Sequence, residues 1–449
     1  MEGNEPEDIN LINQYKNANS TMEGSAPTIL AMGVGGGGCN AVAYMARQGV
    51  KGVDFVVLNT DRQALLPIQV PTKILLGPKC CKGQGAGSKP EIGQLAAEES
   101  APEIEKLLTD DVQMVFVTAG MGGGTGTGAA PVVAELAKKR GILTVGIVTI
   151  PFFFEGMERI KSAIRGASKL QKNVDAMLII NNDRLSTIYP TLAFSEGFSK
   201  ADEILTTAAR TISDMVTILA NINIDMRDVD TCLRDGRTAL ISVGYGEGEN
   251  RLTTAINNAL HSPLLCDTNI MSAKKLLFAF YYSHDINPPL LMSESQQANN
   301  LVASIQQQVH IKFGWGFDDT LGNKIKFSIL ASGFDVSVNT NGTEIEVIEG
   351  KPEEKGSTTS EDLKAIANAY GENKVGELIR KQETQNYYIL EPSELDNDEM
   401  IAMVEATPAY NRDKRRAARA NQPLKVDVQN QTQPKAPKTG SISFSLDDR

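Results

Sequence analysis

The chain has 449 residues, of which 41% are hydrophobic and 22% are charged, a composition typical of a soluble globular protein. This length predicts two folded units with tails rather than one domain. The net charge of -11 argues against a general nucleic-acid binder, so no nucleic-acid partner is expected.

Cysteines, histidines and apolar segments exclude further classes of protein. The five cysteines form no CxxC pair and the three histidines are scattered, so neither a metal site nor a redox motif is predicted. The first residues, MEGNEPEDIN, are acidic where a secretory signal is basic and then apolar. The apolar run 144–154 is interrupted by Pro151 and falls short of the roughly 20 residues that span a membrane. A cytoplasmic protein without direct membrane insertion is expected.

After a tail predicted to be disordered, residues 1–26, strands and helices alternate through residues 27–197. This alternation predicts an α/β domain with a parallel, doubly wound sheet. The strands are almost continuously apolar, as expected when both faces of a sheet are covered. The predicted strands are 28–34, 53–59, 112–120, 143–150 and 176–182, and the predicted helices are 40–49, 90–108 and 129–141.

A central connecting helix is predicted at residues 198–220, because apolar residues recur there at helical spacing. Residues 221–336 are predicted to form a smaller mixed α/β domain. Its expected strands are 238–246, 276–284, 309–317 and 324–334.

The composition changes after residue 336. Residues 337–440 are rich in Glu, Lys, Gln and Pro, which predicts a flexible linker. Within it, residues 359–370 suit a short helix that ends at Gly371. The basic run 412–416 is interpreted as a solvated face of the linker, with contact to an acidic partner or an anionic lipid as the alternative. Residues 441–449, SISFSLDDR, are predicted to be a partner-binding peptide.

Two glycine-rich loops follow predicted strands and precede predicted helices. The first, residues 33–40, offers backbone N–H groups to a phosphate, but it also fits the GxGxxG of a dinucleotide-binding fold, with Asp61 as the ribose acid. The second, Gly122-Gly123-Gly124-Thr125-Gly126-Thr127-Gly128, adds another anion-binding loop, with two threonine hydroxyls for phosphate oxygens or a metal. Two such loops at one sheet edge predict a polyphosphate ligand.

These residues resemble the FtsZ family, the bacterial cell-division GTPases of the tubulin superfamily. GGGTGTG at 122–128 is the tubulin signature. Six further segments match FtsZ in the same order, namely GVGGGGCN at 33–40, NTDRQALL at 59–66, GAGSKPEIG at 85–93, PFFFEG at 151–156, NNDRL at 181–185 and NxDxxDV at 223–229. The resemblance covers about residues 27–336. It implies a tubulin-like GTP-binding domain, the central helix and a C-terminal assembly domain.

The resemblance also implies a nucleotide site for GTP or GDP with Mg2+, and possibly K+. Backbone groups of the glycine loops would hold the phosphates, and Glu155 with Arg159 would reach ribose and phosphate, unless they form only an i,i+4 surface ion pair. Asp202 would accept from guanine, Phe198 would stack on the base, and Asn182 would contact ribose or base. The nucleotide-binding positions are Gly36, Gly37, Gly38, Cys39, Asn40, Ala86, Gly87, Gly124, Thr125, Gly126, Glu155, Arg159, Asn182, Phe198 and Asp202.

The resemblance assigns catalysis to Asn223, Asp225 and Asp228, which one subunit would insert into the nucleotide site of its neighbour. A carboxylate there orients and polarises the water that attacks the γ-phosphate. The alternative is that Asp225 is only a helix N-cap, with Asp228 favoured by the helix dipole. A shared site implies a head-to-tail filament of copies of this chain, because heterologous contacts that do not close generate open polymers.

The implied function is a GTPase that polymerises at the division site on the inner face of the membrane. Its tail would recruit membrane-tethering and septal division proteins. An NAD-dependent oxidoreductase and a GTP-binding scaffold without turnover are the alternatives. Departures from the family pattern are Lys89 in place of Asn, and Met226 and Arg227 in place of Phe-Ala, and they leave the details of the interface open. The C-terminal peptide also lacks the family's usual Pro and basic residues, which leaves the identity of the tether open.

Overall fold

The computed structural model describes residues 29–218, 220–261, 270, 273–294, 309–334 and 360–371. All of them belong to one compact unit, residues 1–376, and the second unit, 377–449, lies outside the described part. The predictions for the N-terminal tail, the basic run and the C-terminal peptide therefore fall outside the described residues. No helix within the described ranges is long and apolar enough to cross a membrane.

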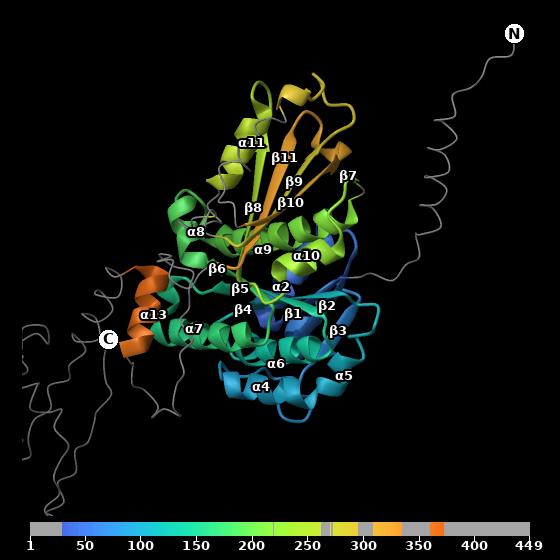
Figure 1. Ribbon diagram of the computed structural model, residues 1–449. Coiled ribbons are helices and arrows are strands. Elements are labelled where there is room, and N and C mark those ends of the chain that lie inside the picture. Colours follow the sequence, from blue (N-terminus) through green and yellow to red (C-terminus); the bar gives the residue numbers. More distant parts are fainter. Residues whose placement is uncertain are drawn as a thin grey trace, which may run out of the picture. The chain divides into compact units, whose positions relative to one another are not determined.

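The elements follow one another in the order expected of an α/β chain (Figure 1). In the first domain they are β1 (Ile29–Val34), α2 (Gly35–Arg47), β2 (Val53–Asn59), α3 (Arg62–Leu65), β3 (Thr72–Leu75), α4 (Pro90–Glu99), α5 (Ala101–Glu105), β4 (Met114–Gly120), α6 (Thr125–Lys139), β5 (Leu143–Ile150), η1 (Phe153–Glu155), α7 (Met157–Lys172), β6 (Ala176–Asn181) and α8 (Asn182–Ile188). The rest are α9 (Phe194–Thr217), β7 (Ala220–Ile222), α10 (Met226–Leu233), β8 (Arg237–Gly246), α11 (Arg251–Leu260), β9 (Lys275–Tyr282), β10 (His310–Phe317), η4 (Asp319–Leu321), β11 (Ile325–Ser332) and α13 (Ser360–Tyr370).

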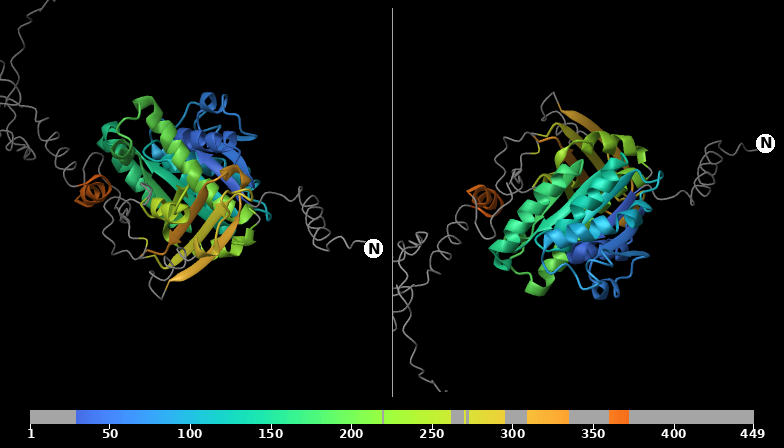
Figure 2. Two further views of the ribbon diagram at one scale, coloured as in Figure 1. Left: turned by 90° about the horizontal axis from the view of Figure 1, so that it is seen from above. Right: turned by 90° about the horizontal axis from the view of Figure 1, so that it is seen from below.

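The first six strands form the predicted parallel sheet, in the order β3-β2-β1-β4-β5-β6. The order reverses between β1 and β4, so this is a doubly wound sheet with its switch point at those strands. Helices α6 and α7 cover one face and helices α2 and α9 the other (Figures 1 and 2). The prediction of a doubly wound α/β domain is confirmed, and β2 and β5 have the predicted bounds.

The remaining strands form a smaller, mixed part of the sheet, in the order β8-β11-β9-β10-β7. Strand β11 runs antiparallel to β8 and β9, whereas β10 runs parallel to β9. A short parallel pairing of β8 with β6 joins the two parts. The four strands predicted in residues 221–336 are all present, so the mixed α/β prediction holds.

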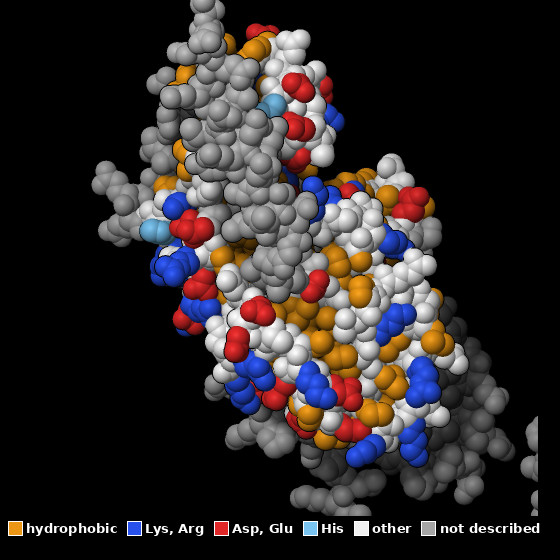
Figure 3. Space-filling view, turned by 90° about the vertical axis from the view of Figure 1, so that its right-hand side faces the viewer, with side chains coloured by type: hydrophobic (Ala, Val, Ile, Leu, Met, Phe, Trp, Pro, Cys, Tyr) orange, Lys and Arg blue, Asp and Glu red, His pale blue; other side chains and the backbone are white. Residues whose placement is uncertain are grey.

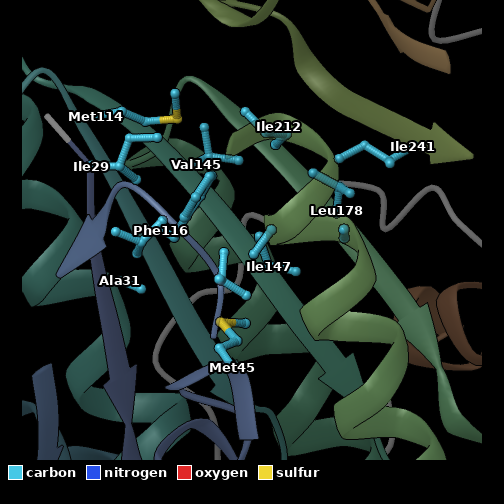
Figure 4. Packing of buried hydrophobic residues seen from close by; sticks show 14 of the residues in the cluster. Ile29, Ala31, Met45, Met114, Phe116, Val145, Ile147, Leu178, Ile212 and Ile241 are labelled. Carbon is cyan, nitrogen blue, oxygen red and sulfur yellow. The ribbon is translucent and has the colours of Figure 1, made fainter. Parts of the chain in front are cut away.

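One hydrophobic core joins the first domain to the second. Ile29 and Phe116 of the parallel sheet, Ile212 of α9 and Ile241 of β8 belong to the same buried cluster (Figure 4). Burying a side chain of this size stabilises the fold by about 2 kcal/mol. Because α9 contributes to this shared core, its position is tied to both domains.

Several element boundaries differ from the predictions, and three differences bear on the architecture. The helix expected at 90–108 is split into α4 and α5 at Ser100, whose hydroxyl accepts from Gly77 N–H. The central helix begins at Phe194, four residues early, and ends at Thr217, because Ile218 is already extended and β7 follows. The short helix expected at residues 359–370 is present as α13. It packs against α7, whereas the sequence predicted that it lies within a flexible linker.

A buried ion pair fixes α9 to the second domain. Lys326 Nζ of β11 lies 2.6 Å from Asp214 Oδ2 of α9, and the side chains are 6% and 16% exposed. Lys326 also lies 5.6 Å from the ring centroid of Tyr281 on β9. Because both charges have left bulk water, each depends on the other for compensation.

Lys326→Met is expected to lower the free energy of unfolding by about 3 kcal/mol, because it leaves the carboxylate of Asp214 buried without its partner. Urea unfolding monitored by circular dichroism measures this loss. Lys324→Met, at an exposed lysine two residues earlier in the chain, serves as the matched control and should stay within about 0.5 kcal/mol of the parent chain. Equal midpoints for the two variants would show that the pair contributes nothing.

Candidate functional site

The first glycine loop connects β1 directly to α2. Gly35 has a φ of +72°, so the chain turns from strand to helix at a residue that only glycine accommodates easily. Gly36 and Gly37 are exposed, and a Cβ placed on Gly36 would meet nothing within 4 Å. The first turn of α2 therefore presents bare backbone N–H groups to open space.

The second glycine loop connects β4 to α6, and its threonines have different roles. Thr127 Oγ1 accepts from Gly122 N–H at 2.8 Å, so this hydroxyl holds the loop together, and a contact of its proton with a ligand stays a prediction. Thr125 Oγ1 lies 2.7 Å from Thr60 Oγ1. When Thr60 donates in this pair, the hydroxyl proton of Thr125 stays available for a phosphate oxygen.

The glycine loops touch each other and a third loop. A Cβ on Gly35 would lie 2.6 Å from the backbone nitrogen of Gly126, and a Cβ on Gly124 would lie 2.8 Å from the backbone nitrogen of Lys89 and 2.9 Å from Ala86 Cβ. Gly87, next to Ala86, has a positive φ. The structure thus brings the predicted positions of residues 36–40, 86–87 and 124–126 to one edge of the sheet.

Helix capping distinguishes the starts of α2 and α6 from those of α3 and α10. Asp61 caps α3 and Asp225 caps α10, each accepting from backbone N–H groups at the start of its helix. Within residues 29–218, α2 and α6 have no side-chain cap and no acidic residue in the first turn. Their N–H groups and positive dipole ends are left for an anion, and two such ends side by side suit a polyphosphate.

Cys39 can serve this site only through its backbone. Its side chain is buried, and the thiol donates to the carbonyl oxygens of Gly33 and Leu58. Burial raises the pKa of the Cys39 thiol to about 12, so it stays neutral and is not a nucleophile. The next residue, Asn40, is exposed.

Glu155 and Arg159 lie on the segment that follows β5. Glu155 Oε1 accepts from Phe152 N–H at 2.8 Å, and Oε2 lies 3.1 Å from Arg159 Nη1. A Cβ on Gly122 would lie 2.8 Å from Arg159 Cγ, so this segment reaches the second glycine loop. Glu155 and Arg159 therefore form the i,i+4 ion pair that was the alternative interpretation. A contact of this pair with ribose or phosphate stays a prediction.

The expected contacts with the base lie on two helices, Asn182 at the start of α8 and Phe198 with Asp202 in the first half of α9. Asn182 Oδ1 is buried and has no hydrogen-bond partner among the described residues, so it can accept from a ligand. Phe198 is 46% exposed and packs edge-on against Phe152, with ring centroids 5.2 Å apart. Burial raises the pKa of Asp202 to about 7, although the positive charge of Arg47 acts in the opposite direction.

Asp225 and Asp228 lie at the opposite edge of the sheet from the glycine loops. Asp225 lines a cavity of about 760 Å3 with other residues of α10 and with residues 108–110, 112–113 and 140–142, which precede β4 and β5. Asp228 follows Asp225 in the first turn of α10. The glycine loops instead follow β1 and β4. Because β4 has seven residues at about 3.3 Å each, roughly 20 Å separates the two edges. One copy of the chain cannot bring its aspartates to its own glycine loops.

The two aspartates differ in how their oxygens are used. Asp228 Oδ2 accepts from Asp225 N–H at 3.0 Å, and Asp225 Oδ1 accepts from Asp228 N–H at 2.9 Å. This reciprocal capping box is the structural role that was the alternative for Asp225. The carboxylate of Asp225 is nevertheless exposed, so capping and a role toward a ligand are compatible. Asn223 is also exposed, between β7 and α10.

Sequence reasoning missed Lys312 on β10. Its Nζ lies 3.1 Å from Asp228 Oδ1, so both oxygens of Asp228 are engaged and the capping box carries a compensating charge. The available signal was a lysine in a largely apolar strand, HIKFGWGF. A surface charge is not distinctive in itself, because Figure 3 shows charged and hydrophobic side chains interspersed over one face of the molecule. Nothing in sequence spacing relates it to Asp228, 84 positions earlier.

Comparison with known proteins gives matches along most of the chain. Residues 28–190 match the family described as "Tubulin/FtsZ family, GTPase domain", residues 237–335 match "FtsZ family, C-terminal domain", and residues 382–418 match "FtsZ, C-terminal".

Among curated relatives, "Cell division protein FtsZ" of Porphyromonas gingivalis is 43% identical over 408 residues, 88% of each chain. "Cell division protein FtsZ 1" of Thermococcus kodakarensis is 42% identical, covering 68% of this chain and 80% of its own.

A solved "FtsZ dimer, empty" from M. jannaschii is 36% identical, with a TM-score of 0.64 over 71% of this chain and 92% of that one.

The pKa of Asp202 generates a test of the expected base pocket. A carboxylate can accept from both N1–H and the 2-amino group of guanine, and protonation removes that capacity. Since the pKa is about 7, the ionised form dominates above neutrality and is lost as the pH falls. The affinity for GDP is therefore expected to be about tenfold weaker at pH 6 than at pH 8.

Calorimetric titration with GDP across this range, on the parent chain and on Asp202→Asn, measures the effect. The variant controls for titration of the nucleotide phosphates, because it lacks only the ionisable side chain. The contribution of Asp202 is the difference between the two pH slopes. Identical slopes would rule out a titrating Asp202 in guanine binding.

Proposed function

The chain belongs to the FtsZ family of tubulin-like GTPases, and from that premise we propose that successive copies of it share each site of GTP hydrolysis. The chain is a filament-forming GTPase of cell division. The proposal concerns the residues, the ions and the partners through which it acts.

One observation carries the proposal: the uncapped glycine loops and the paired aspartates lie at opposite edges of one parallel sheet. A site that needs both must take the loops from one copy and the aspartates from the next. The contact is then heterologous, and repeating it without closure extends a filament. Hydrolysis is thereby restricted to assembled subunits.

Each group has a defined task in this proposal. The backbone N–H groups of α2 and α6 bind the phosphates. The hydroxyl of Thr125 donates a hydrogen bond to a phosphate oxygen, and Asp202 selects guanine. Asp225 of the following subunit orients the attacking water and accepts its proton, because its carboxylate is exposed. Asp228, engaged by Asp225 N–H and Lys312, holds Asp225 in place.

The proposed ions are Mg2+ and, as a further possibility, K+. The described residues contain no cluster of three or more His, Cys, Asp or Glu side chains that could bind a metal. A divalent ion would therefore rest mainly on phosphate oxygens, with the hydroxyl of Thr125 nearby. When bound, such an ion neutralises charge on the β- and γ-phosphates.

The proposed cellular site is the cytoplasmic face of the membrane where division occurs. We assign recruitment of membrane-tethering and septal proteins to the C-terminal tail. An NAD-dependent oxidoreductase leaves the second glycine loop and the distant aspartates without a role, and the family assignment gives it no support. A scaffold without turnover is distinguished by the hydrolysis measurements below.

Asp225→Asn is expected to leave GTP binding and assembly in place and to lower steady-state phosphate release about 100-fold. Asn caps a helix about as well as Asp, so the substitution removes the charge but keeps the start of α10. Pelleting and a phosphate assay with GTP and Mg2+ measure both properties. Asp318→Asn, which changes another Asp N-cap, at η4, is the control. Parent-like turnover in Asp225→Asn would contradict the role of this carboxylate.

Lys312→Met is expected to lower the turnover number roughly fivefold, because Asp228 then holds Asp225 less firmly. This corresponds to an increase of about 1 kcal/mol in the activation free energy. The concentration of GTP at half-maximal rate should stay unchanged, because Lys312 lies far from the chain's own nucleotide loops. Lys312→Arg should restore the rate by preserving the charge. A fall in assembly of Lys312→Met that accounts for the whole loss of rate would contradict positioning.

A further inference from the structure

Helix α13 packs onto the first domain although about 190 residues of sequence separate it from its contacts. Ala365, Ile366 and Ala369 are buried, with exposed fractions of 1%, 0% and 7%. Their spacing of i, i+1 and i+4 places them on one side of the helix, which contacts α7 (Figures 1 and 2). The helix falls between the segments that match known families, 237–335 and 382–418, so no family description covers it.

An ion pair anchors the start of α13 on α7. Asp362 is 1% exposed, and its two carboxylate oxygens accept from Arg165 Nη2 at 2.8 Å and Nε at 3.3 Å. A two-point contact between guanidinium and carboxylate fixes orientation as well as distance. A carboxylate this buried requires its partner, so the register of α13 on α7 is specified.

The end of α13 is bound to the segment that carries Glu155. Tyr370 Oη donates to the carbonyl oxygen of Pro151 at 2.7 Å, and the rings of Tyr370 and Phe153 lie 5.8 Å apart. Burial raises the pKa of the Tyr370 phenol, so the hydroxyl keeps its proton and remains a donor. Gly371, with a φ of +91°, then closes the helix by donating to Ala367 O.

A second set of bonds ties α13 to the residues beside Asn182. Asn181 Nδ2 donates to Ala369 O at 2.7 Å, and its Oδ1 accepts from Asp183 N–H at 2.9 Å. Asp183 Oδ1 in turn accepts from Phe153 N–H at 3.1 Å. The hydrogen bonds run from α13 through Asn181 and Asp183 to Phe153, and the ring contact of Phe153 with Tyr370 leads back to α13.

We propose that α13 is a positioning element of the nucleotide site, which holds the segment 151–155 and residues 181–182 in the arrangement that binds the ribose side of GTP or GDP. This inference rests on the proposed function, because it takes Glu155 and Asn182 as nucleotide contacts. It adds that nucleotide affinity depends on a helix outside the GTPase domain. By linkage, bound nucleotide must stabilise the docked helix to the same extent.

The test uses the full-length chain and a fluorescent GDP analogue, so that filament assembly does not enter the measurement. The combined variant Asp362→Asn with Tyr370→Phe is expected to bind the analogue about tenfold more weakly, a typical size for coupling between sites. Asn368→Ala, at an exposed position of the same helix, is the matched control and should bind like the parent chain.

Hydrogen exchange measures whether bound nucleotide protects α13 in particular, which a general loss of stability does not explain. In the parent chain, amides of residues 362–371 should exchange more slowly when the GDP analogue is bound, and this protection should shrink in the combined variant. Parent-like affinity in a variant whose α13 amides exchange freely overturns the proposal. If the combined variant does not fold, Tyr370→Phe alone, which removes one oxygen atom, decides by the same criteria.

The outcomes also separate this inference from the proposed function. Failure of the parent chain to bind the GDP analogue contradicts the proposed nucleotide site itself. Binding by the parent chain with equal affinity in every variant contradicts only the role of α13. Arg165→Met breaks the same ion pair from the α7 side and should reproduce the loss caused by Asp362→Asn.

Discussion

The direction of the strands in the parallel sheet is the constraint on which the rest of this molecule depends. All six strands of the first domain point the same way, so every loop that follows a strand emerges at one edge. Phosphate-binding loops must lie there, because a helix N-terminus follows each strand end. Every crossover helix returns the chain to the other edge, and α9 with β7 leads there to the paired aspartates. Separation of the two half-sites is thus a property of the topology, and assembly is how the protein reunites them.

Helix capping shows how the same backbone requirement is met in two ways. At α3 and α10 an aspartate occupies the N-cap and satisfies the first N–H groups. At α2 the N-cap is Val34 and the first turn consists of glycines, at α6 the N-cap is Gly124, and neither N-cap residue makes a side-chain capping hydrogen bond. The first backbone N–H groups of α2 and α6 have no partner within their own helix, so a bound anion can accept their hydrogen bonds. At α10 the cap also locks Asp225 and Asp228 together, which suits a carboxylate that must reach a neighbouring copy in a fixed orientation.

Much of the fold follows from the sequence because its signals are local. Continuous apolar runs such as Val53–Asn59 and Leu143–Ile150 define strands with little ambiguity, and glycine loops after strands identify the phosphate edge. Contacts between distant segments carry no such signal. In the sequence, Lys312 is an ordinary strand residue and Asp362 an ordinary linker charge. Only the fold shows that Lys312 pairs with Asp228 and that Asp362 pairs with Arg165. Thr127 likewise accepts from Gly122 N–H, a contact within the loop that sequence spacing does not reveal.

Helix α9 gives the separated half-sites a mechanical connection. Asp202 lies near its start, and its end leads through β7 to Asp225, so one element of 24 residues, roughly 36 Å long, connects the proposed guanine contact to the proposed catalytic carboxylate. Its middle and end are fixed by the shared core and by the ion pair of Asp214 with Lys326. A shift of α9 along its axis therefore moves the second domain with it, since the buried pair resists separation. In the proposed filament, α9 would therefore link the nucleotide at one contact to the aspartates presented at the next.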